Sequence, residues 1–263
     1  MENFGYHAPT KIADAAQLAE ANEDAKLMAG GMTLLPTLKQ RLAAPSDLID
    51  LAGIADLRGV CRDGDEIVIG AMTTHAEVHE SAVLRETIAG LASLAGQIGD
   101  PAVRHRGTIG GSIANADPAA DYPAGVLGHG ATIVTNKRKI AADDFFLGLF
   151  ETALEPGEII TGVRFPIPVW STYQKLRHPA SGYAVVGVCI VQTKTGVRVA
   201  VTGAGTSAFR MAAMEEALTK DFSVKSIEGI AVAADDLNND IHASAAYRAH
   251  VVSVLAKRAV ASR

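Results

Sequence analysis

Hydrophobic and polar positions over residues 1–54 follow two spacings, one typical of helices and one typical of strands. In chain order they predict a helix over 15–21, a strand over 26–29, a helix over 34–42 and a strand over 46–51. Thr10 or Asp14 can cap the first helix, and Thr33 can cap the second. The glycine pair Gly30 and Gly31 therefore lies where a strand ends and a helix begins.

The pattern over residues 55–165 predicts a mixture of strands and helices. The expected elements are a hairpin of strands 57–61 and 66–69 around Asp63-Gly64-Asp65, a helix over 75–80 capped by Thr73 or Thr74, an amphipathic helix over 84–98 stopped by Asp100-Pro101, and strands over 130–135 and 159–165. His75 and His79 stand four apart on one helix face, which is a metal-ligand spacing. Because no third ligand is nearby, a solvated helix face is the stronger interpretation.

The pattern changes after Pro166 and Pro168, where we place a domain boundary. The elements predicted beyond it are strands over 173–177, 183–192 and 197–202, and helices over 208–218 and 243–261. Short turns join the strands, so we expect an antiparallel sheet. Ser244 is a suitable cap for the last helix. The sequence therefore predicts a smaller α+β domain over 168–263.

Composition excludes several classes of function. The chain has 263 residues, of which 48% are hydrophobic and 20% charged, as in globular proteins. A net charge of −5 without a basic run argues against nucleic-acid binding, and 5% aromatic residues are too few for a base-stacking surface. No apolar run approaches the length of a membrane span, and the N-terminus has no signal-peptide pattern. We therefore expect a cytoplasmic protein.

The two cysteines, Cys61 and Cys189, each lie in an apolar, strand-like stretch. We expect both to be core or sheet residues, because a structural disulfide is rare in the expected compartment. A [2Fe–2S] centre needs about four protein ligands, mostly thiolates. This chain cannot build such a centre alone.

Two glycine pairs are the main candidates for ligand binding, one within Ala29–Thr33 and one within Thr108–Ser112. A run of backbone N–H groups with no side chain in the way can hold a phosphate. Two such segments predict one extended ligand gripped from two sides, and a dinucleotide pyrophosphate fits that description. The alternative is that both pairs are plain tight turns.

The stretch 112–123 after the second pair is long, poor in bulky residues and rich in turn formers, which is typical of a binding loop. Asp117 and Asp121 in it could accept hydrogen bonds from ribose hydroxyls or cap local backbone. A competing fingerprint, Gly-x-Gly-x-x-Ala over 203–208, follows the strand 197–202. The preceding strands form hairpins and no parallel array, so we interpret it as a close-packed strand-to-helix turn.

At residues 29–42 and 107–121 the sequence resembles the FAD-binding medium subunit of molybdenum hydroxylases, of the carbon monoxide dehydrogenase and xanthine dehydrogenase kind. Segments 154–160 and 240–248 share the likeness, which covers essentially the whole chain. The sequence departs from the family at Met32, where a polar residue is common, and at Arg104-His105-Arg106, where Arg-Asn is commoner.

The resemblance implies an α+β fold: a two-part FAD-binding domain of the vanillyl-alcohol-oxidase (PCMH) type over 1–167, divided at about 1–54 and 55–167, and a C-terminal domain over 168–263 with an antiparallel sheet. It also implies a set of FAD-binding residues. These are Ala29, Gly30, Gly31, Met32, Thr33, Thr108, Ile109, Gly110, Gly111, Ser112, Asp121, Ile160 and Lys175.

The resemblance further implies an electron-transfer subunit that passes electrons from partner [2Fe–2S] centres through FAD to an external acceptor. Its partners would be a large molybdenum-cofactor subunit and a small [2Fe–2S] subunit, as a dimer of heterotrimers. This chain would hold no catalytic acid–base residue and no metal, and Tyr173 or Lys175 would only tune the flavin. The alternatives are a stand-alone FAD-dependent oxidoreductase and a non-enzymatic nucleotide-binding scaffold. We expect Gly110→Val to abolish FAD retention and leave the fold largely intact.

Overall fold

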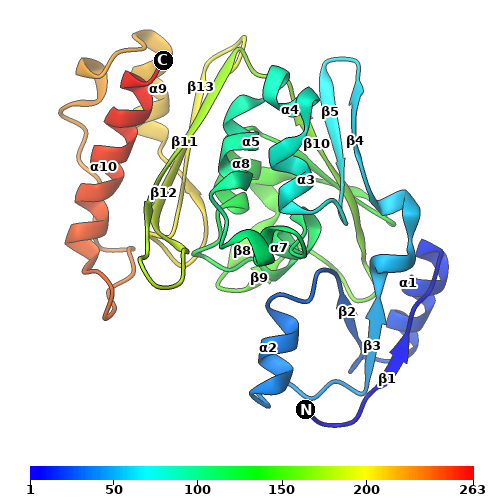
Figure 1. The fold of residues 1–263 in the computed structure, drawn as a ribbon. Coiled ribbons are helices and arrows are strands. Elements are labelled where there is room, and N and C mark those ends of the chain that lie inside the picture. Colours follow the sequence, from blue (N-terminus) through cyan, green and yellow to red (C-terminus); the bar gives the residue numbers. More distant parts are fainter.

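The computed structural model describes residues 1–263, which form three successive parts (Figure 1). The N-terminal part has a three-stranded sheet, the middle part a five-stranded sheet with a group of helices, and the C-terminal part a four-stranded sheet with two helices. In Figure 1 the C-terminal helices, the C-terminal sheet, the middle helices and the five-stranded sheet follow one another as layers. The N-terminal part lies at one end of these layers.

The N-terminal part is a small parallel sheet with two helices. Its elements are β1 (Gly5–His7), α1 (Ile12–Ala21), β2 (Lys26–Met28), α2 (Leu34–Lys39) and β3 (Asp47–Asp50), with strand order β1-β3-β2, followed by the 3-10 turns η1 (Leu51–Gly53) and η2 (Ala55–Leu57). The predicted succession of helix, strand, glycine pair and helix is confirmed.

The predicted helix caps in this part are wrong. Helix α1 begins earlier than predicted, and Lys11 occupies the cap position without a side-chain hydrogen bond. Thr33 occupies the cap position of α2 with helical backbone angles, and its side chain caps nothing. The prediction of 34–42 was too long, because Arg41 adopts a positive φ of 58° that ends the helical path.

The middle part is an antiparallel sheet covered by short helices. The strands, in spatial order, are β4 (Val60–Asp63), β5 (Glu66–Gly70), β10 (Ile160–Pro166), β6 (Thr132–Thr135) and β7 (Lys139–Ala141). The other elements are α3 (His75–Glu80), α4 (Ala82–Thr87), α5 (Ala89–Gly96), α6 (Pro101–Arg104), α7 (Ile109–Asn115), α8 (Tyr122–Gly128), η3 (Ala142–Asp144), β8 (Phe146–Gly148) and β9 (Glu151–Thr152). The predicted hairpin and the helix over 75–80 are confirmed, and Thr74 caps the latter in a capping box with Glu77.

The single helix predicted over 84–98 is wrong. The structure has α4 and α5 in its place, because Ile88 leaves helical geometry with φ −137° and ψ 58°. Ile88 is fully buried, and the break directs the apolar side chains of both helices into one core. Asp100, predicted only to stop that helix, is the N-cap of α6, where its carboxylate accepts from the Val103 N–H.

The C-terminal part has the predicted antiparallel sheet. Its elements are β11 (Trp170–Arg177), β12 (Ala184–Gln192), β13 (Val197–Thr202), β14 (Phe209–Arg210), α9 (Ala212–Lys220), η4 (Lys225–Ile227) and α10 (Ala245–Ala261). Ser244 caps α10 as predicted. The helix predicted over 208–218 was placed too early, because β14 precedes it. The segment after Gly203 is therefore a close-packed connection between two strands, rather than the strand-to-helix turn predicted there.

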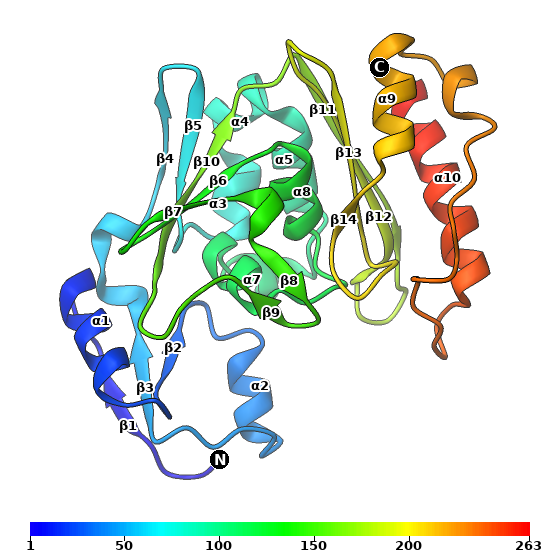
Figure 2. The same cartoon turned by 180° about the vertical axis from the view of Figure 1, so that it is seen from behind.

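Both faces of the C-terminal sheet are buried, which explains the nearly continuous apolar run of β12. Cys189 and Val191 pack into the core of the middle part, where α5 and α8 lie, and Val188 and Ile190 face the core formed with α9 and α10 (Figures 1 and 2). Both cysteines are strand residues as predicted, with Cys189 buried in β12 and Cys61 exposed in β4. The C-terminal sheet is thus fixed to the middle part over a broad apolar face.

Candidate functional site

The structure brings the two glycine segments into direct contact. A Cβ on Gly30 would lie 1.9 Å from the Arg106 carbonyl oxygen and 2.9 Å from the Gly107 Cα. A Cβ on Gly111 would lie 3.1 Å from the Ala29 Cβ. Because backbone meets backbone at Gly30, glycine is needed there for the contact itself. The first segment belongs to the N-terminal part and the second to the middle part, so the candidate site lies at their junction.

The first glycine segment carries a run of unused hydrogen-bond donors. The backbone N–H groups of residues 30–34 make no hydrogen bond within the chain. Gly31 has a φ of +74°, a left-handed conformation that curves the chain between β2 and α2. Successive N–H groups in such a turn form a concave surface that binds anions. These unpaired donors are what a pyrophosphate-binding segment requires.

The second glycine segment is already hydrogen-bonded and is helical. Thr108 caps α7, and its hydroxyl accepts from the Gly111 N–H at 3.1 Å. The Ile109 and Gly110 N–H groups donate to the carbonyls of Thr73 and Ala71. The expected long loop is therefore wrong over 112–115, which belongs to α7. The second segment therefore packs closely against the first, but its N–H groups over 109–112 are not free to bind a ligand.

Gly110 is buried inside the fold and not at the ligand side. A Cβ there would lie 2.6 Å from the Ala71 Cβ and 2.7 Å from the Ala71 oxygen, at the end of β5. Valine at this position would displace core backbone. The structure contradicts the expectation that Gly110→Val leaves the fold intact, and this substitution cannot separate ligand loss from unfolding.

Asp121 and Lys175 form a buried pair between the middle and C-terminal parts. The Lys175 Nζ lies 2.9 Å from Asp121 Oδ2, and the Tyr173 hydroxyl donates to Asp121 Oδ1 at 2.5 Å. Lys175 also donates to the Gln97 carbonyl at 3.1 Å, and the two charged side chains are 1% and 4% exposed. Burial raises the pKa of the Asp121 carboxyl, and the Lys175 ammonium opposes that rise. Their hydrogen-bonding capacity is thus used largely inside the protein.

The remaining predicted site residues differ in exposure. Met32 and Thr33 are exposed beside the glycine pair, and Ser112 is half-buried in α7. Ile160 is a core residue at a bulge in β10. Ala71 connects this part of β10 to the second glycine segment. The Ala71 N–H donates to the carbonyl of Thr161, the neighbour of Ile160, and the Ala71 carbonyl accepts from the Gly110 N–H.

Asp117 adopts one of its two predicted roles. Its Oδ1 accepts from the Ala119 N–H at 2.9 Å, so it caps local backbone in the turn between α7 and α8. Burial raises the pKa of this carboxyl. Arg106 and Gly107 were not among the predicted residues, although they form the contact with Gly30. A third glycine, Gly107, directly before the Thr-Ile-Gly-Gly motif, was the sequence feature that could have indicated this close backbone contact.

The predicted solvated face of α3 is wrong at His75. This ring is buried, with its centroid 5.3 Å from that of Tyr122, and its Nε2 lies 2.5 Å from where a Gly107 Cβ would be. His79 Nδ1 lies 2.9 Å from the Ala92 carbonyl oxygen. No group of three or more His, Cys, Asp or Glu side chains in the chain is placed to hold a metal ion. The buried His75 ring therefore packs against Gly107, directly before the second glycine segment.

Acidification between pH 6.5 and 4 should destabilise the protein through two buried histidines. Burial lowers the pKa of His75 and of His129 to about 4. In that window the unfolded chain binds more protons than the folded one, so stability falls as pH falls, by at most about 1.4 kcal/mol per pH unit for each group. Urea unfolding from pH 7 to pH 4 measures this slope. His129→Phe should make the pH dependence of stability shallower, and the substitution His250→Asn at an exposed position is the control. Equal slopes in wild-type protein and His129→Phe would contradict a role of His129 in this pH dependence.

The fold and sequence match a known family along the whole chain. The family described as the FAD binding domain in molybdopterin dehydrogenase matches residues 2–168, and the CO dehydrogenase flavoprotein C-terminal domain matches residues 171–262. The carbon monoxide dehydrogenase medium chain of Hydrogenophaga pseudoflava is 36% identical over 275 residues, covering 98% of this chain and 96% of the relative. The nicotine 6-hydroxylase medium subunit of Paenarthrobacter nicotinovorans is 34% identical, covering 97% and 95%.

Solved structures agree with these relatives. The reconstituted CO dehydrogenase from Oligotropha carboxidovorans aligns with a TM-score of 0.94 at 33% identity, over 99% of this chain and 97% of that one. Its likeness confirms the predicted α+β class with an FAD-binding domain followed by a smaller domain. None of the helices is both long and apolar enough to cross a bilayer. The chain belongs to the family of FAD-binding medium subunits of molybdenum hydroxylases, and is an oxidoreductase subunit with FAD as its cofactor.

Proposed function

We propose that this chain holds FAD where the two glycine segments meet and serves as an electron-transfer subunit. The observation that carries the proposal is the run of free backbone N–H groups over residues 30–34, directed by a left-handed Gly31. A pyrophosphate needs several donors and no competing side chain, and the contacts of Gly30 and Gly111 leave no room for one there. The residues present therefore fit an FAD.

The chain's own residues would bind and orient the cofactor. The N–H groups after Gly30 would hold the pyrophosphate, and α7 with its Thr108 cap would form the opposite wall. The exposed Met32 would contact it only through its backbone or its apolar side chain. Bound FAD would supply the conversion between single-electron and paired-electron transfer. Asp121, Ile160 and Lys175 stay predicted contacts of FAD; Ile160 is a core residue and the other two are paired in the interior.

The electrons would come from [2Fe–2S] centres of a small partner subunit and go to an external acceptor. Two cysteines, one exposed and one buried, cannot ligate such a cluster in this chain. Relatives named as a medium chain and as a subunit of a dehydrogenase complex, and a similar structure named Cu,Mo-CO dehydrogenase, support a large molybdenum-cofactor partner as well. A dimer of heterotrimers, a cytoplasmic location and the domain division at 167/168 remain predictions.

Purification from the native host, with any copurifying subunits, tests this function. We expect flavin absorption near one FAD per chain, together with molybdenum and iron in the larger assembly. In rapid mixing with a donor for the molybdenum subunit, the clusters and the flavin should be reduced in the same turnover. Flavin-free protein that takes up no added FAD would contradict the proposal. A pure single chain that couples a donor to an acceptor by itself would favour a stand-alone oxidoreductase.

A further inference from the structure

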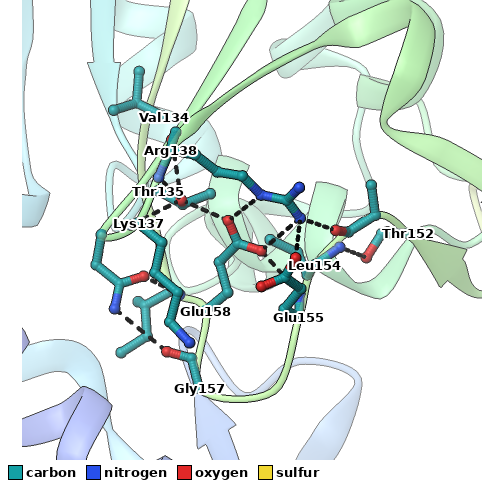
Figure 3. A network of polar contacts seen from close by, with 12 residues as sticks. Val134, Thr135, Lys137, Arg138, Thr152, Leu154, Glu155, Gly157 and Glu158 are labelled. Carbon is teal, nitrogen blue, oxygen red and sulfur yellow. Dashed lines mark hydrogen bonds and ion pairs between the residues drawn. The ribbon is translucent and has the colours of Figure 1, made fainter.

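A turn in the middle part is fixed by a fully buried carboxylate (Figure 3). Glu158 lies just before β10, and its side chain is 0% exposed. Its Oε1 accepts from the Thr135 hydroxyl at 2.7 Å and from Arg138 Nε at 3.0 Å. Its Oε2 accepts from an Arg138 terminal nitrogen at 3.0 Å and from the Glu155 N–H at 2.9 Å. We call residues 135–138 and 155–159, joined in this way, the joint.

The joint is attached directly to the N-terminal part. Ile159, next to Glu158, is buried in the apolar core of that part with residues of α1 and β3. Gly157 packs on α1, where a Cβ would lie 2.3 Å from the Glu20 Cγ. Lys137 Nζ lies 3.0 Å from Glu20 Oε1 and also donates to the Pro156 carbonyl. In Figure 2 the chain before β10 runs down to the N-terminal sheet.

The N-terminal part meets the middle part at the joint, at the glycine segments and at Met72, which packs into its core and donates to the Leu57 carbonyl. A compact part held at several places cannot move at one without moving at the others, because packed interiors yield little. A small rotation about the joint would change the separation of Gly30 from Arg106 and Gly107, which are already in backbone contact. The geometry of the joint thus bears on the geometry of the candidate FAD site.

We propose that Glu158 is a positioning residue for FAD: by locking the joint it sets the N-terminal part at the angle that closes the two glycine segments on the cofactor. The proposal rests on the proposed function, since it assumes FAD at that junction. Glu158 touches neither glycine segment and acts only through Ile159, Gly157 and the Lys137–Glu20 contact.

A carboxylate suits this role because it is an acceptor only. Four donors converge on the two oxygens of Glu158. In Glu158→Gln an amide nitrogen would face two of these donors, and the turn would have to shift to relieve the contact. The size of the side chain would barely change, so the substitution tests the lock and not the packing.

Glu215 offers a matched control in another part of the molecule. Its carboxylate is also buried, accepts from the Val199 N–H at 2.9 Å and pairs with Arg210 through two contacts of 2.9 and 2.6 Å. It joins α9 to β13, away from the glycine segments. Glu215→Gln should therefore lower the melting temperature to a similar extent without acting on the N-terminal part.

The test measures FAD affinity and melting temperature for the whole chain purified with any copurifying subunits. We expect Glu158→Gln to weaken FAD binding by roughly 10-fold or more, as misplacement of a binding group does, and Glu215→Gln to leave FAD affinity within about twofold at a similar loss of melting temperature. Equal FAD affinity in the two variants would overturn the proposal. Wild-type protein that binds no FAD would overturn the proposed function instead.

A second pair of variants decides the matter if Glu158→Gln does not fold. Lys137→Met and Glu20→Gln remove the outer contact of the joint, and both side chains are partly exposed, so folding should survive. Each should weaken FAD binding measurably, and the double variant should lose no more than Lys137→Met alone, because Lys137 makes both the contact with Glu20 and the one with the Pro156 carbonyl. Unchanged FAD affinity in both single variants would overturn the proposal.

Discussion

Gly30→Ala is expected to abolish FAD retention while most of the fold survives. The new Cβ would lie 1.9 Å from the Arg106 carbonyl oxygen, whereas ordinary contacts begin near 3.4 Å. The N-terminal and middle parts would have to separate by more than 1 Å at the site, and a displacement of about 1 Å in a binding group can cost about 100-fold. The separate C-terminal core between the sheet, α9 and α10 should be unaffected. Flavin absorbance per chain after dialysis, with far-ultraviolet circular dichroism, measures both effects.

Gly64→Ala is the control for this substitution. Gly64 lies in the β4–β5 turn with nothing within 4 Å of its Cβ position and a φ of +62°. Alanine there costs roughly 1–2 kcal/mol of backbone strain and touches neither glycine segment. We expect normal FAD content in that variant. Normal FAD content in Gly30→Ala would show that the junction of the two segments does not hold the cofactor.

Lys175→Met is expected to lower the free energy of unfolding by about 3–5 kcal/mol, because it leaves the buried Asp121 carboxyl without its partner. Urea unfolding at neutral pH measures the loss. The double variant Lys175→Met/Asp121→Asn should regain much of the stability, since an uncharged pair has no uncompensated charge. Lys220→Met, in an exposed pair with Glu216, should cost less than about 0.5 kcal/mol.

The outcome separates two roles for Lys175. A residue that mainly joins the C-terminal sheet to the middle part should affect stability in FAD-free protein as strongly as in loaded protein. If Lys175 mainly contacts the flavin, its substitution should lower the free energy of unfolding only when FAD is present, because bound FAD stabilises the folded state by mass action. Loss confined to the loaded protein would contradict the structural role that its contacts with Asp121 and Gln97 indicate.

Sequence alone predicted the elements whose signals are local. The hairpin at Gly64, the capping Thr74 and the capping Ser244 follow from turn and cap chemistry. The mostly apolar run over 183–192 predicted a strand there, which β12 confirms. The family resemblance added the two-domain architecture and FAD, which the family comparisons confirm.

The errors arose where distant contacts override local pattern. Ile88 breaks a helix that spacing predicts as continuous, because its side chain is fully buried in the core of the middle part. His75 is buried because it supports Gly107, which lies far along the chain. The composition around the second glycine pair predicts a loop. In the structure this segment is the first turn of α7, and its Ile109 and Gly110 N–H groups donate to carbonyls just after β5. The pattern around Glu158 did not reveal its role, since three of its four donors belong to Thr135 and Arg138, more than 19 residues earlier in the chain.

A crystal or cryo-EM structure of the FAD-loaded protein tests the central claim most directly. We predict that the pyrophosphate oxygens lie within hydrogen-bond distance of backbone N–H groups among residues 30–34, with α7 forming the opposite wall. FAD bound elsewhere in the chain, with those N–H groups left to solvent, would contradict the account.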